Sequence, residues 1–216
     1  HRLSYRKRQP QYSITPYYIM HTYRINEIFY SIQGEGHNAG CAAVFVRFSG
    51  CNLHCPFCDT HHQEGTMMSA EDICNEIEKY PASMVVLTGG EPSLFVDSPL
   101  CDAIHAIGRT IAMETNGSRP VSLPIDHITC SPKFEYNDAE TAKLRLSHID
   151  ELKVVFTGKN DMSLYDDIEA DNYYLQPCDT GNLEETKKIA KQTLDYILQH
   201  PKWKLSVQLH KILNVR

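Results

Sequence analysis

The 216-residue chain has no run of the roughly 18 apolar residues that a membrane-spanning helix needs, so the sequence predicts no membrane span. Basic side chains are also in the minority: 21 Lys and Arg stand against 27 Asp and Glu, a formal net charge of −6. Four of those 21 lie in the first ten positions, so 17 basic residues face 27 acids in the rest of the chain. This acidic balance argues against a domain that binds the phosphate backbone of nucleic acids, and we expect no nucleic-acid partner.

The sequence also predicts no secretory signal. The basic N-terminal stretch has no apolar core, because Pro10, Gln11, Ser13 and Pro16 interrupt it. We therefore expect a cytoplasmic, reducing location, where cysteines are metal ligands or small buried hydrophobes more often than disulfides. Three of the eight cysteines cluster within eight residues. We expect the other five to pack in the core: Cys41, Cys74, Cys101, Cys130 and Cys178.

The length and the 42% hydrophobic content suit one α/β domain. Residues 1–19 read as a tail, disordered or non-native, before a single domain over 20–216. β-like segments are expected at 24–30, 43–48, 84–87, 110–113, 127–130, 152–156, 173–175 and 205–209. Helices are expected from Ser69 towards Tyr80, from Ser98-Pro99, from Asn182 with Ile189, Thr193, Leu194 and Ile197 on one face, and between most of the other strands. The alternation predicts a largely parallel sheet in an open or partial β/α barrel.

A tight cysteine loop follows the expected strand at 43–48. It reads Cys51-Asn-Leu-His-Cys55-Pro-Phe-Cys58, and three thiolates at this spacing can hold three irons of a four-iron cluster, leaving the fourth iron open. The alternative is a structural zinc site, with His54, His61, His62 or Asp59 as the fourth ligand. Zinc knuckles usually pair two short cysteine elements, and the sequence holds no second pair.

Four polar turns follow successive expected strands. They are Thr88-Gly89-Gly90-Glu91-Pro92, Glu114-Thr115-Asn116-Gly117, Ser131-Pro132-Lys133 and Gln176-Pro177-Cys178-Asp179. In open α/β sheets, ligands bind beyond the carboxyl ends of parallel strands, so we expect these turns to share one site with the cysteine loop.

The cysteine loop, followed some thirty residues later by the Gly89-Gly90 turn, resembles the radical S-adenosylmethionine (SAM) superfamily. The resemblance implies a [4Fe-4S] cluster on Cys51, Cys55 and Cys58 that binds SAM at its open iron. One electron then cleaves SAM to a 5′-deoxyadenosyl radical, so the cofactor supplies the hard chemistry and the protein aims and shields it.

Two further segments narrow the resemblance. These are the run from Ile28 to Gly36, containing Ile-Gln-Gly-Glu-Gly, and the run from Val46 to Leu53, with Asp59-Thr60 after the third cysteine. They resemble the 7-carboxy-7-deazaguanine synthase family of 7-deazapurine and queuosine biosynthesis. The resemblance implies a lyase that contracts the ring of 6-carboxy-5,6,7,8-tetrahydropterin with loss of ammonia. Two alternatives stay open: a radical SAM activase acting on a protein partner, and a zinc-binding module without turnover.

The same resemblance implies the site residues. Arg47 would bind the substrate carboxylate, or else form a structural salt bridge, and Thr60 would bind Mg²⁺, or else cap a helix. Substrate would contact Ile32, Gln33, Gly34, Glu35, Arg47, Thr88, Glu114, His210 and Arg216. SAM would contact Phe57, Cys58, Asp59, Gly90, Asn116, Ser131, Pro132, Lys133, Gln176, Pro177, Cys178 and Asp179. It also implies a homodimer and a flavodoxin- or ferredoxin-type electron donor.

Overall fold

The structure is a computed structural model that describes residues 21–58, 60 and 63–215. Its centre is a nine-stranded sheet in the order β3-β1-β2-β4-β5-β6-β7-β8-β9. The strands are β1 Thr22–Ile32, β2 Ala42–Phe48, β3 Thr66–Ser69, β4 Met84–Gly89, β5 Thr110–Thr115, β6 His127–Cys130, β7 Glu151–Phe156, β8 Asn172–Pro177 and β9 Lys204–Leu205. The predicted tail, residues 1–19, lies outside the described part of the chain.

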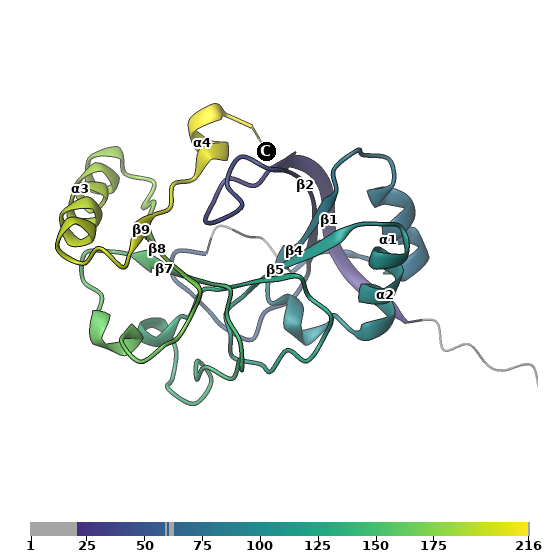
Figure 1. Cartoon of the computed structure of the whole chain (residues 1–216), viewed down its shortest axis with the longest axis horizontal. Helices are drawn as coiled ribbons and strands as arrows, with labels where there is room; N and C mark the ends of the chain where they lie inside the picture. Colours follow the sequence, from purple (N-terminus) through teal and green to yellow (C-terminus); the bar gives the residue numbers. More distant parts are fainter. Residues whose placement is uncertain (1–20, 59, 61–62, 216) are drawn as a thin grey trace, which may run out of the picture.

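From β2 to β9 every strand pairing is parallel, whereas β1 pairs antiparallel with both β2 and β3. The sheet is strongly curved, with helices on its outer side (Figure 1). It does not close, because no pairing joins β3 to β9 among the described residues. The predicted partial barrel with a largely parallel sheet is therefore confirmed.

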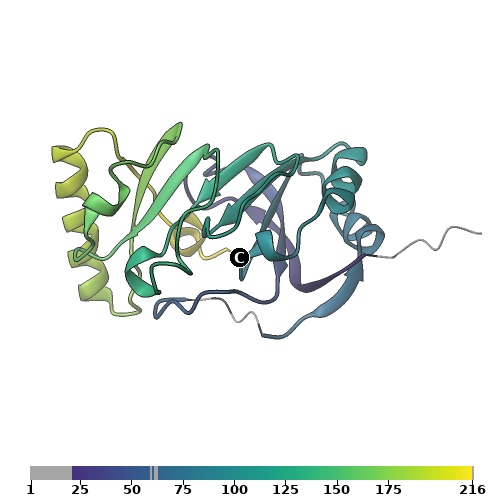
Figure 2. The same ribbon diagram turned by 90° about the horizontal axis from the view of Figure 1, so that it is seen from below.

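Four α-helices are described: α1 Ala70–Ile77, α2 Ser98–Ala106, α3 Leu183–Gln199 and α4 Leu209–Leu213. Each of the first three begins where a capping side chain satisfies free backbone N–H groups. Ser69 and Asp72 form a capping box at α1, Asp97 caps α2, and Asn182 caps α3. The α1–α2 pair and α3 lie at opposite ends of the molecule (Figure 2). None of the helices in the described residues is long and apolar enough to cross a membrane.

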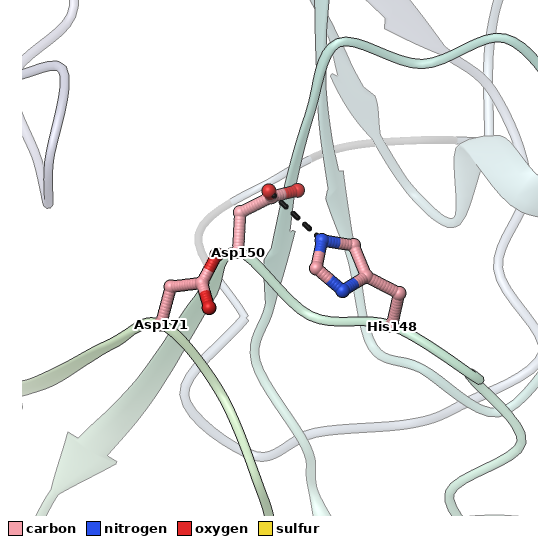
Figure 3. Close-up of side chains that lie close together, drawn as sticks. All are labelled: His148, Asp150 and Asp171. Carbon is pink, nitrogen blue, oxygen red and sulfur yellow. Dashed lines mark hydrogen bonds and ion pairs between the residues drawn. The ribbon is translucent and has the colours of Figure 1, made fainter.

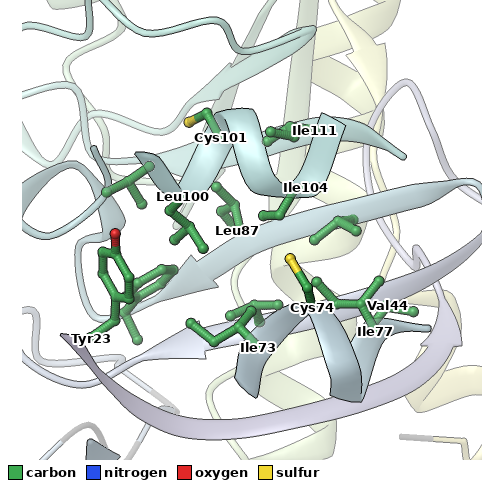
Figure 4. Packing of buried hydrophobic residues seen from close by; sticks show 14 of the residues in the cluster. Tyr23, Val44, Ile73, Cys74, Ile77, Leu87, Leu100, Cys101, Ile104 and Ile111 are labelled. Carbon is green, nitrogen blue, oxygen red and sulfur yellow. The ribbon is translucent and has the colours of Figure 1, made fainter. Parts of the chain in front are cut away.

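The larger apolar core lies between the α1–α2 pair and the first strands. Figure 4 shows Ile73 and Ile77 of α1 facing the same cluster as Leu100 and Ile104 of α2. A second core lies under α3, where Tyr196 and Ile197 pack against β7 and β8 residues. Burying these side chains stabilises the sheet that carries the site, at roughly 25 cal/mol per Å² of apolar surface.

Several predicted elements were wrong. No α-helix connects β5 to β6, β6 to β7 or β7 to β8 in the described chain. The connections are irregular, with 3₁₀ turns at Phe134–Tyr136 and Met162–Tyr165. In the connection from β5 to β6, Pro120 and Pro124 lack the N–H groups that a helix needs. Leu194 was predicted to lie on the packed face of α3, but 46% of it is exposed.

The last predicted strand, 205–209, is also mostly wrong. β9 ends at Leu205, and Leu209 already begins α4. Ser206 still donates its backbone N–H to the carbonyl of Leu175, and the chain then turns so that Gln208 reaches Glu35. The polar contacts of Gln208 therefore end the strand where the alternating pattern suggested that it continues.

Candidate active site

One cavity of about 350 Å³ collects almost all of the predicted site residues. Those that line it are Ile32, Gln33, Gly34, Glu35, Arg47, Cys51, Cys55, Phe57, Cys58, Thr60, Thr88, Gly90, Glu114, Asn116, Ser131, Lys133, Gln176, Pro177, Cys178, Asp179 and His210. Pro132 is buried behind the lining. Asp59 and Arg216 lie outside the described residues. The predicted convergence of the polar turns and the cysteine loop is confirmed.

The cysteine loop leaves β2 through Gly50, whose φ of +100° suits glycine. Asn137 holds the loop from the opposite side: its Oδ1 accepts the backbone N–H of His54 at 3.1 Å, and its Nδ2 lies 3.9 Å from the Cys55 sulfur. Burial raises the pKa values of the Cys51 and Cys55 thiols. Iron binding requires thiolates, so loading this loop must release protons.

The spacing of the three sulfurs bears on the metal. In a tetrahedral zinc site, sulfurs 2.3 Å from the metal lie only about 3.8 Å apart. Among the described residues, the only group of three ligand atoms mutually within 4.8 Å is His148, Asp150 and Asp171, so the three cysteines are more widely spread. At least one pair of these sulfurs is therefore farther apart than the ligands of a single tetrahedral zinc, and Cys51, Cys55 and Cys58 all line the same cavity.

The Gly89-Gly90 turn packs directly against the start of the cysteine loop. Gly90 donates its N–H to the Phe48 carbonyl at 3.0 Å, and Glu91 donates to the Gly50 carbonyl at 2.9 Å. A Cβ on Gly90 would overlap the Gly50 carbonyl. The glycine therefore permits a close approach of two backbones, and this approach fixes the distance between the turn and the cysteine loop.

Glu91 joins the ends of β4 and β5. Its carboxylate is 1% exposed and accepts from the Thr115 hydroxyl at 2.6 Å and from the Asn116 N–H at 2.7 Å. The side chain of Asn116 in turn donates to Asn52 of the cysteine loop at 3.2 Å. This chain of contacts sets the position of three loops at the carboxyl edge of the sheet.

The turns after β6 and β8 complete that edge. The buried Lys133 ammonium donates to the carbonyl and the hydroxyl of Ser131, at 2.5 and 2.6 Å, and burial lowers its pKa. Asp179, which lies just after β8, forms an ion pair of 2.7 Å with Lys211 of α4.

Cys178 is 6% exposed, and Cys74, Cys101 and Cys130 are buried as well, as predicted. The prediction that Cys41 packs in the core is wrong, because Cys41 is exposed.

The opposite side of the cavity is a floor made by residues 33–36. Because β1 runs antiparallel to β2, this segment enters from the edge of the sheet opposite the cysteine loop. Gln33 donates to Glu114 at 3.0 Å, and Thr88 donates to the second oxygen of Glu114 at 2.9 Å. The floor is therefore polar and pre-arranged.

Glu35 is the most heavily bonded residue of that floor. One of its oxygens accepts from Lys153 at 2.5 Å, and the other from Gln176 and Gln208 at 3.0 and 2.9 Å. Burial by itself would raise the pKa of Glu35, but Lys153 and the two amides outweigh it and hold the pKa at about 2. Glu35 is thus an ionised, fixed acceptor and not a solvated turn acid.

Arg47 projects from β2 into the cavity wall. Its Nε donates to Glu27 at 2.9 Å, its Nη1 donates to the Thr60 hydroxyl at 3.3 Å, and the guanidinium lies over the Phe29 ring. The salt bridge that was the alternative for Arg47 is present, and the residue also lines the cavity. An arginine fixed on two sides offers its remaining N–H groups in a defined direction.

Four residues central to this arrangement were missed by the sequence analysis: Lys153, Gln208, Glu91 and Asn137. A signal was available for Lys153, because a lysine within the apolar strand Leu152–Phe156 is unusual. Glu91 lay inside a motif already singled out, yet its partners come from another strand. Gln208 directly precedes the Leu209-His210-Lys211 run that contributes to the family resemblance, whereas nothing in the local sequence marks Asn137.

A second polar cluster lies away from the cavity. The Nε2 of His148 donates to the Asp150 carboxylate at 3.0 Å, with Asp171 beside them (Figure 3). His148 and Asp171 are exposed. None of the three lines the cavity.

Comparison with known proteins gives the family. Residues 45–129 match the model of the Radical SAM superfamily. The 7-carboxy-7-deazaguanine synthase of Bacteroides thetaiotaomicron is 48% identical over 193 residues, covering 89% of this chain and 98% of that protein. The protein of the same name from Burkholderia multivorans is 41% identical, covering 90% of this chain and 99% of its own length.

A solved structure agrees with these relatives. The crystal structure of QueE from Escherichia coli superposes with a TM-score of 0.71 at 26% identity, covering 88% of this chain and 95% of that one. These relatives support neither the activase nor the zinc module that the sequence left open. With such identity over nearly the whole length, the chain belongs to the 7-carboxy-7-deazaguanine synthase family of radical SAM enzymes.

Proposed function

We propose that this chain converts 6-carboxy-5,6,7,8-tetrahydropterin to 7-carboxy-7-deazaguanine with loss of ammonia, within 7-deazapurine and queuosine biosynthesis. The observation that carries the proposal is that Arg47 and the Glu35–Glu114 floor line the same cavity as the three loop cysteines. A carboxylate-binding group and a set of fixed acceptors therefore lie on one side of the cavity, with the cluster ligands at its mouth.

The cofactors fit the residues at the carboxyl edge. Cys51, Cys55 and Cys58 would hold the [4Fe-4S] cluster, which together with SAM supplies a hydrogen-abstracting radical when reduced. SAM would lie along the backbone of the four strand-end turns, against Phe57, Cys58, Asp59, Gly90, Asn116, Ser131, Pro132, Lys133, Gln176, Pro177, Cys178 and Asp179. These residues would shield and orient SAM, and none of them has to exchange a proton.

Substrate recognition falls to the wall and the floor. Arg47 would bind the substrate carboxylate through the N–H groups that Glu27 and Thr60 leave over. Gln33, Glu35, Thr88 and Glu114 would bind the aminopyrimidinone ring, with Ile32, Gly34, His210 and Arg216 around it. Holding both ends of the substrate fixes the position of its reacting carbon relative to the cofactor.

Mg²⁺ fits at Thr60. Its hydroxyl lines the cavity beside Arg47, and an oxygen ligand next to an incoming carboxylate suits a hard cation that keeps most of its waters. The substrate carboxylate would then be shared between Arg47 and the cation.

We further propose one domain over residues 20–216, a homodimer, a cytoplasmic location and a flavodoxin- or ferredoxin-type electron donor. The single domain is supported by the continuous sheet from β1 to β9. The donor follows from the need of a four-iron cluster for single electrons.

The test is anaerobic turnover of the reconstituted protein with SAM, Mg²⁺, dithionite and 6-carboxytetrahydropterin, read by mass spectrometry. We expect 7-carboxy-7-deazaguanine from the wild type, none from Cys55→Ala and much less from Arg47→Ala. Cys74→Ala and Arg145→Ala, outside the cavity, are the matched controls and should retain product formation. Deoxyadenosine without the deazaguanine would mean that the cluster chemistry is right and the substrate wrong.

A further inference from the structure

Lys153 is a buried cation in the cavity that the reaction as proposed above does not use. It lies in β7, whose alternate residues Leu152, Val154 and Phe156 face the second apolar core. The other face of the strand turns Lys153 and Val155 to the cavity. Only 7% of the Lys153 side chain is exposed, and a buried ammonium is costly unless it is paired.

The pairing of Lys153 is one-sided. Its Nζ donates to Glu35 at 2.5 Å, whereas Glu114 is 3.9 Å away, beyond hydrogen-bond range. An ammonium has three donors, and within the described part of the chain this one makes a single hydrogen bond. Lys153 therefore retains donor capacity at the cavity surface.

The neighbouring donors are partly committed. Gln176 and Gln208 donate to Glu35, while Gln33 and Thr88 donate to Glu114. The other buried ammonium, Lys133, is held by Ser131 at the far edge of the sheet. Each of the three amide NH₂ groups keeps one further N–H, but Lys153 is the cationic donor among these groups and has two N–H groups left for a ligand.

Lys153 also sits between two carboxylates that share one low-dielectric floor. Burial alone would lower its pKa, but Glu35 and Glu114 outweigh burial and raise it, so Lys153 stays charged. In return its charge keeps Glu35 ionised. The floor thus presents a positive donor directly beside fixed negative acceptors.

A 2-amino-4-oxopyrimidine ring carries the complementary pattern. The amino group and the ring N3–H are donors, and the 4-oxo group next to them is an acceptor. Carboxylates can bind the first two, but the oxo group needs a donor. Resting on the proposed function, we propose that Lys153 is a specificity-determining substrate-binding residue that donates to the 4-oxo oxygen and selects oxo over amino at that position.

The test compares two ligands on the reconstituted holoenzyme with SAM bound. The probes are 6-carboxypterin, which has the 4-oxo group, and its 2,4-diamino analogue, which presents donors there. We expect the wild type to prefer the oxo compound by roughly tenfold to hundredfold, the range for a hydrogen bond to a charged group. Lys153→Met should lower that preference, chiefly by weakening the oxo compound, while the carboxylates still discriminate against the diamino analogue, which lacks the N3–H.

Two companion variants separate recognition from structure. Lys153→Gln keeps an N–H donor without the charge and should retain part of the preference. Lys204→Met removes an exposed lysine of β9 that lies outside the cavity and should leave the preference unchanged. A purely structural role for Lys153 predicts that both ligands weaken equally in Lys153→Met with an unchanged ratio, and that outcome would overturn the inference.

The inference and the proposed function fail differently. If wild-type enzyme makes 7-carboxy-7-deazaguanine while Lys153→Met retains the wild-type ligand preference, the role of Lys153 is wrong and the reaction stands. If the wild type neither converts 6-carboxytetrahydropterin nor binds 6-carboxypterin, both are wrong. In every arm, iron content and thermal midpoint report whether the variant has folded and loaded.

Discussion

The carboxylate of Glu91, just after β4, accepts a 2.7 Å hydrogen bond from the backbone N–H of Asn116, just after β5. Its other oxygen accepts from the Thr115 hydroxyl, so two adjacent strand ends are joined through one fully buried side chain. Because Asn116 also contacts Asn52, this junction extends to the cysteine loop. The relative positions of these three loops at the carboxyl edge of the sheet thus depend on the buried Glu91 side chain.

Glu91→Gln should therefore harm both stability and SAM binding. The amide can replace only one acceptor oxygen and would direct its NH₂ at a donor, so we expect a loss of about 1–3 kcal/mol in the free energy of unfolding. Urea midpoints and the Kd for SAM measure the two effects. Glu140→Gln, an exposed acid paired with Arg145, is the control. Wild-type values for both quantities in Glu91→Gln would contradict the role described.

Gly90→Ala should prevent proper loading of iron. The added methyl would overlap the Gly50 carbonyl, a backbone atom that can move only with the cysteine loop. We expect iron and acid-labile sulfide per chain to fall severalfold after reconstitution. Gly108→Ala has open space around the new methyl and a φ of +75°, so it should cost only about 1 kcal/mol of stability and load normally. Equal iron content in the two variants would refute the steric argument.

Thr60→Ala should weaken the response to Mg²⁺ more than the binding of SAM. Removing the hydroxyl takes away both an oxygen ligand and an acceptor for Arg47. We expect the Mg²⁺ concentration for half-maximal turnover to rise about tenfold, and Thr60→Ser to restore it. Titration with Mg²⁺ at saturating SAM makes the measurement. An unchanged Mg²⁺ dependence in Thr60→Ala would remove Thr60 from the cation site.

His148 should contribute a pH-dependent part of the stability. Its hydrogen bond with Asp150, and then the charge of that carboxylate, raise the pKa of His148 above 6.5. A raised pKa means that the contribution is fully present below about pH 6.5 and is lost as the pH rises through the folded-state value. The urea midpoint of His148→Gln should therefore differ from wild type more at pH 6 than at pH 8.5. A difference that is larger at pH 8.5 would have the wrong sign.

The sequence could predict the sheet because its strands are short apolar runs closed by turn residues. The runs at 84–87, 127–130 and 152–156 all became strands, and their order gave a parallel, incomplete barrel. The helix starts at Ser69 and Asn182 were also predictable, since capping depends on residues within one turn. The predicted helices between β5 and β8 were wrong: the β5–β6 connection holds Pro120 and Pro124, and the two later connections are irregular with short 3₁₀ turns.

The site was predictable wherever its residues sit in local motifs, and not where they meet through folding. Cysteine spacing and Gly89-Gly90 could be read directly, whereas Lys153 and Gln208 reach Glu35 from 118 and 173 residues away. The antiparallel direction of β1 was equally invisible, and it decides that residues 33–36 form a floor and not part of the upper rim. Such relationships depend on strand order, which no short segment encodes.

The contact between residues 206–211 and the loop after β1 has a consequence for how the protein is made. Leu209 donates to the Gly34 carbonyl, Gln208 donates to Glu35, and Ser206 accepts from Gly36. A loop near the start of the described chain is therefore secured by residues 170 or more positions later. Until those residues leave the ribosome, Glu35 lacks the hydrogen bond from Gln208, so the substrate floor cannot be completed before nearly all of the described chain has been synthesised.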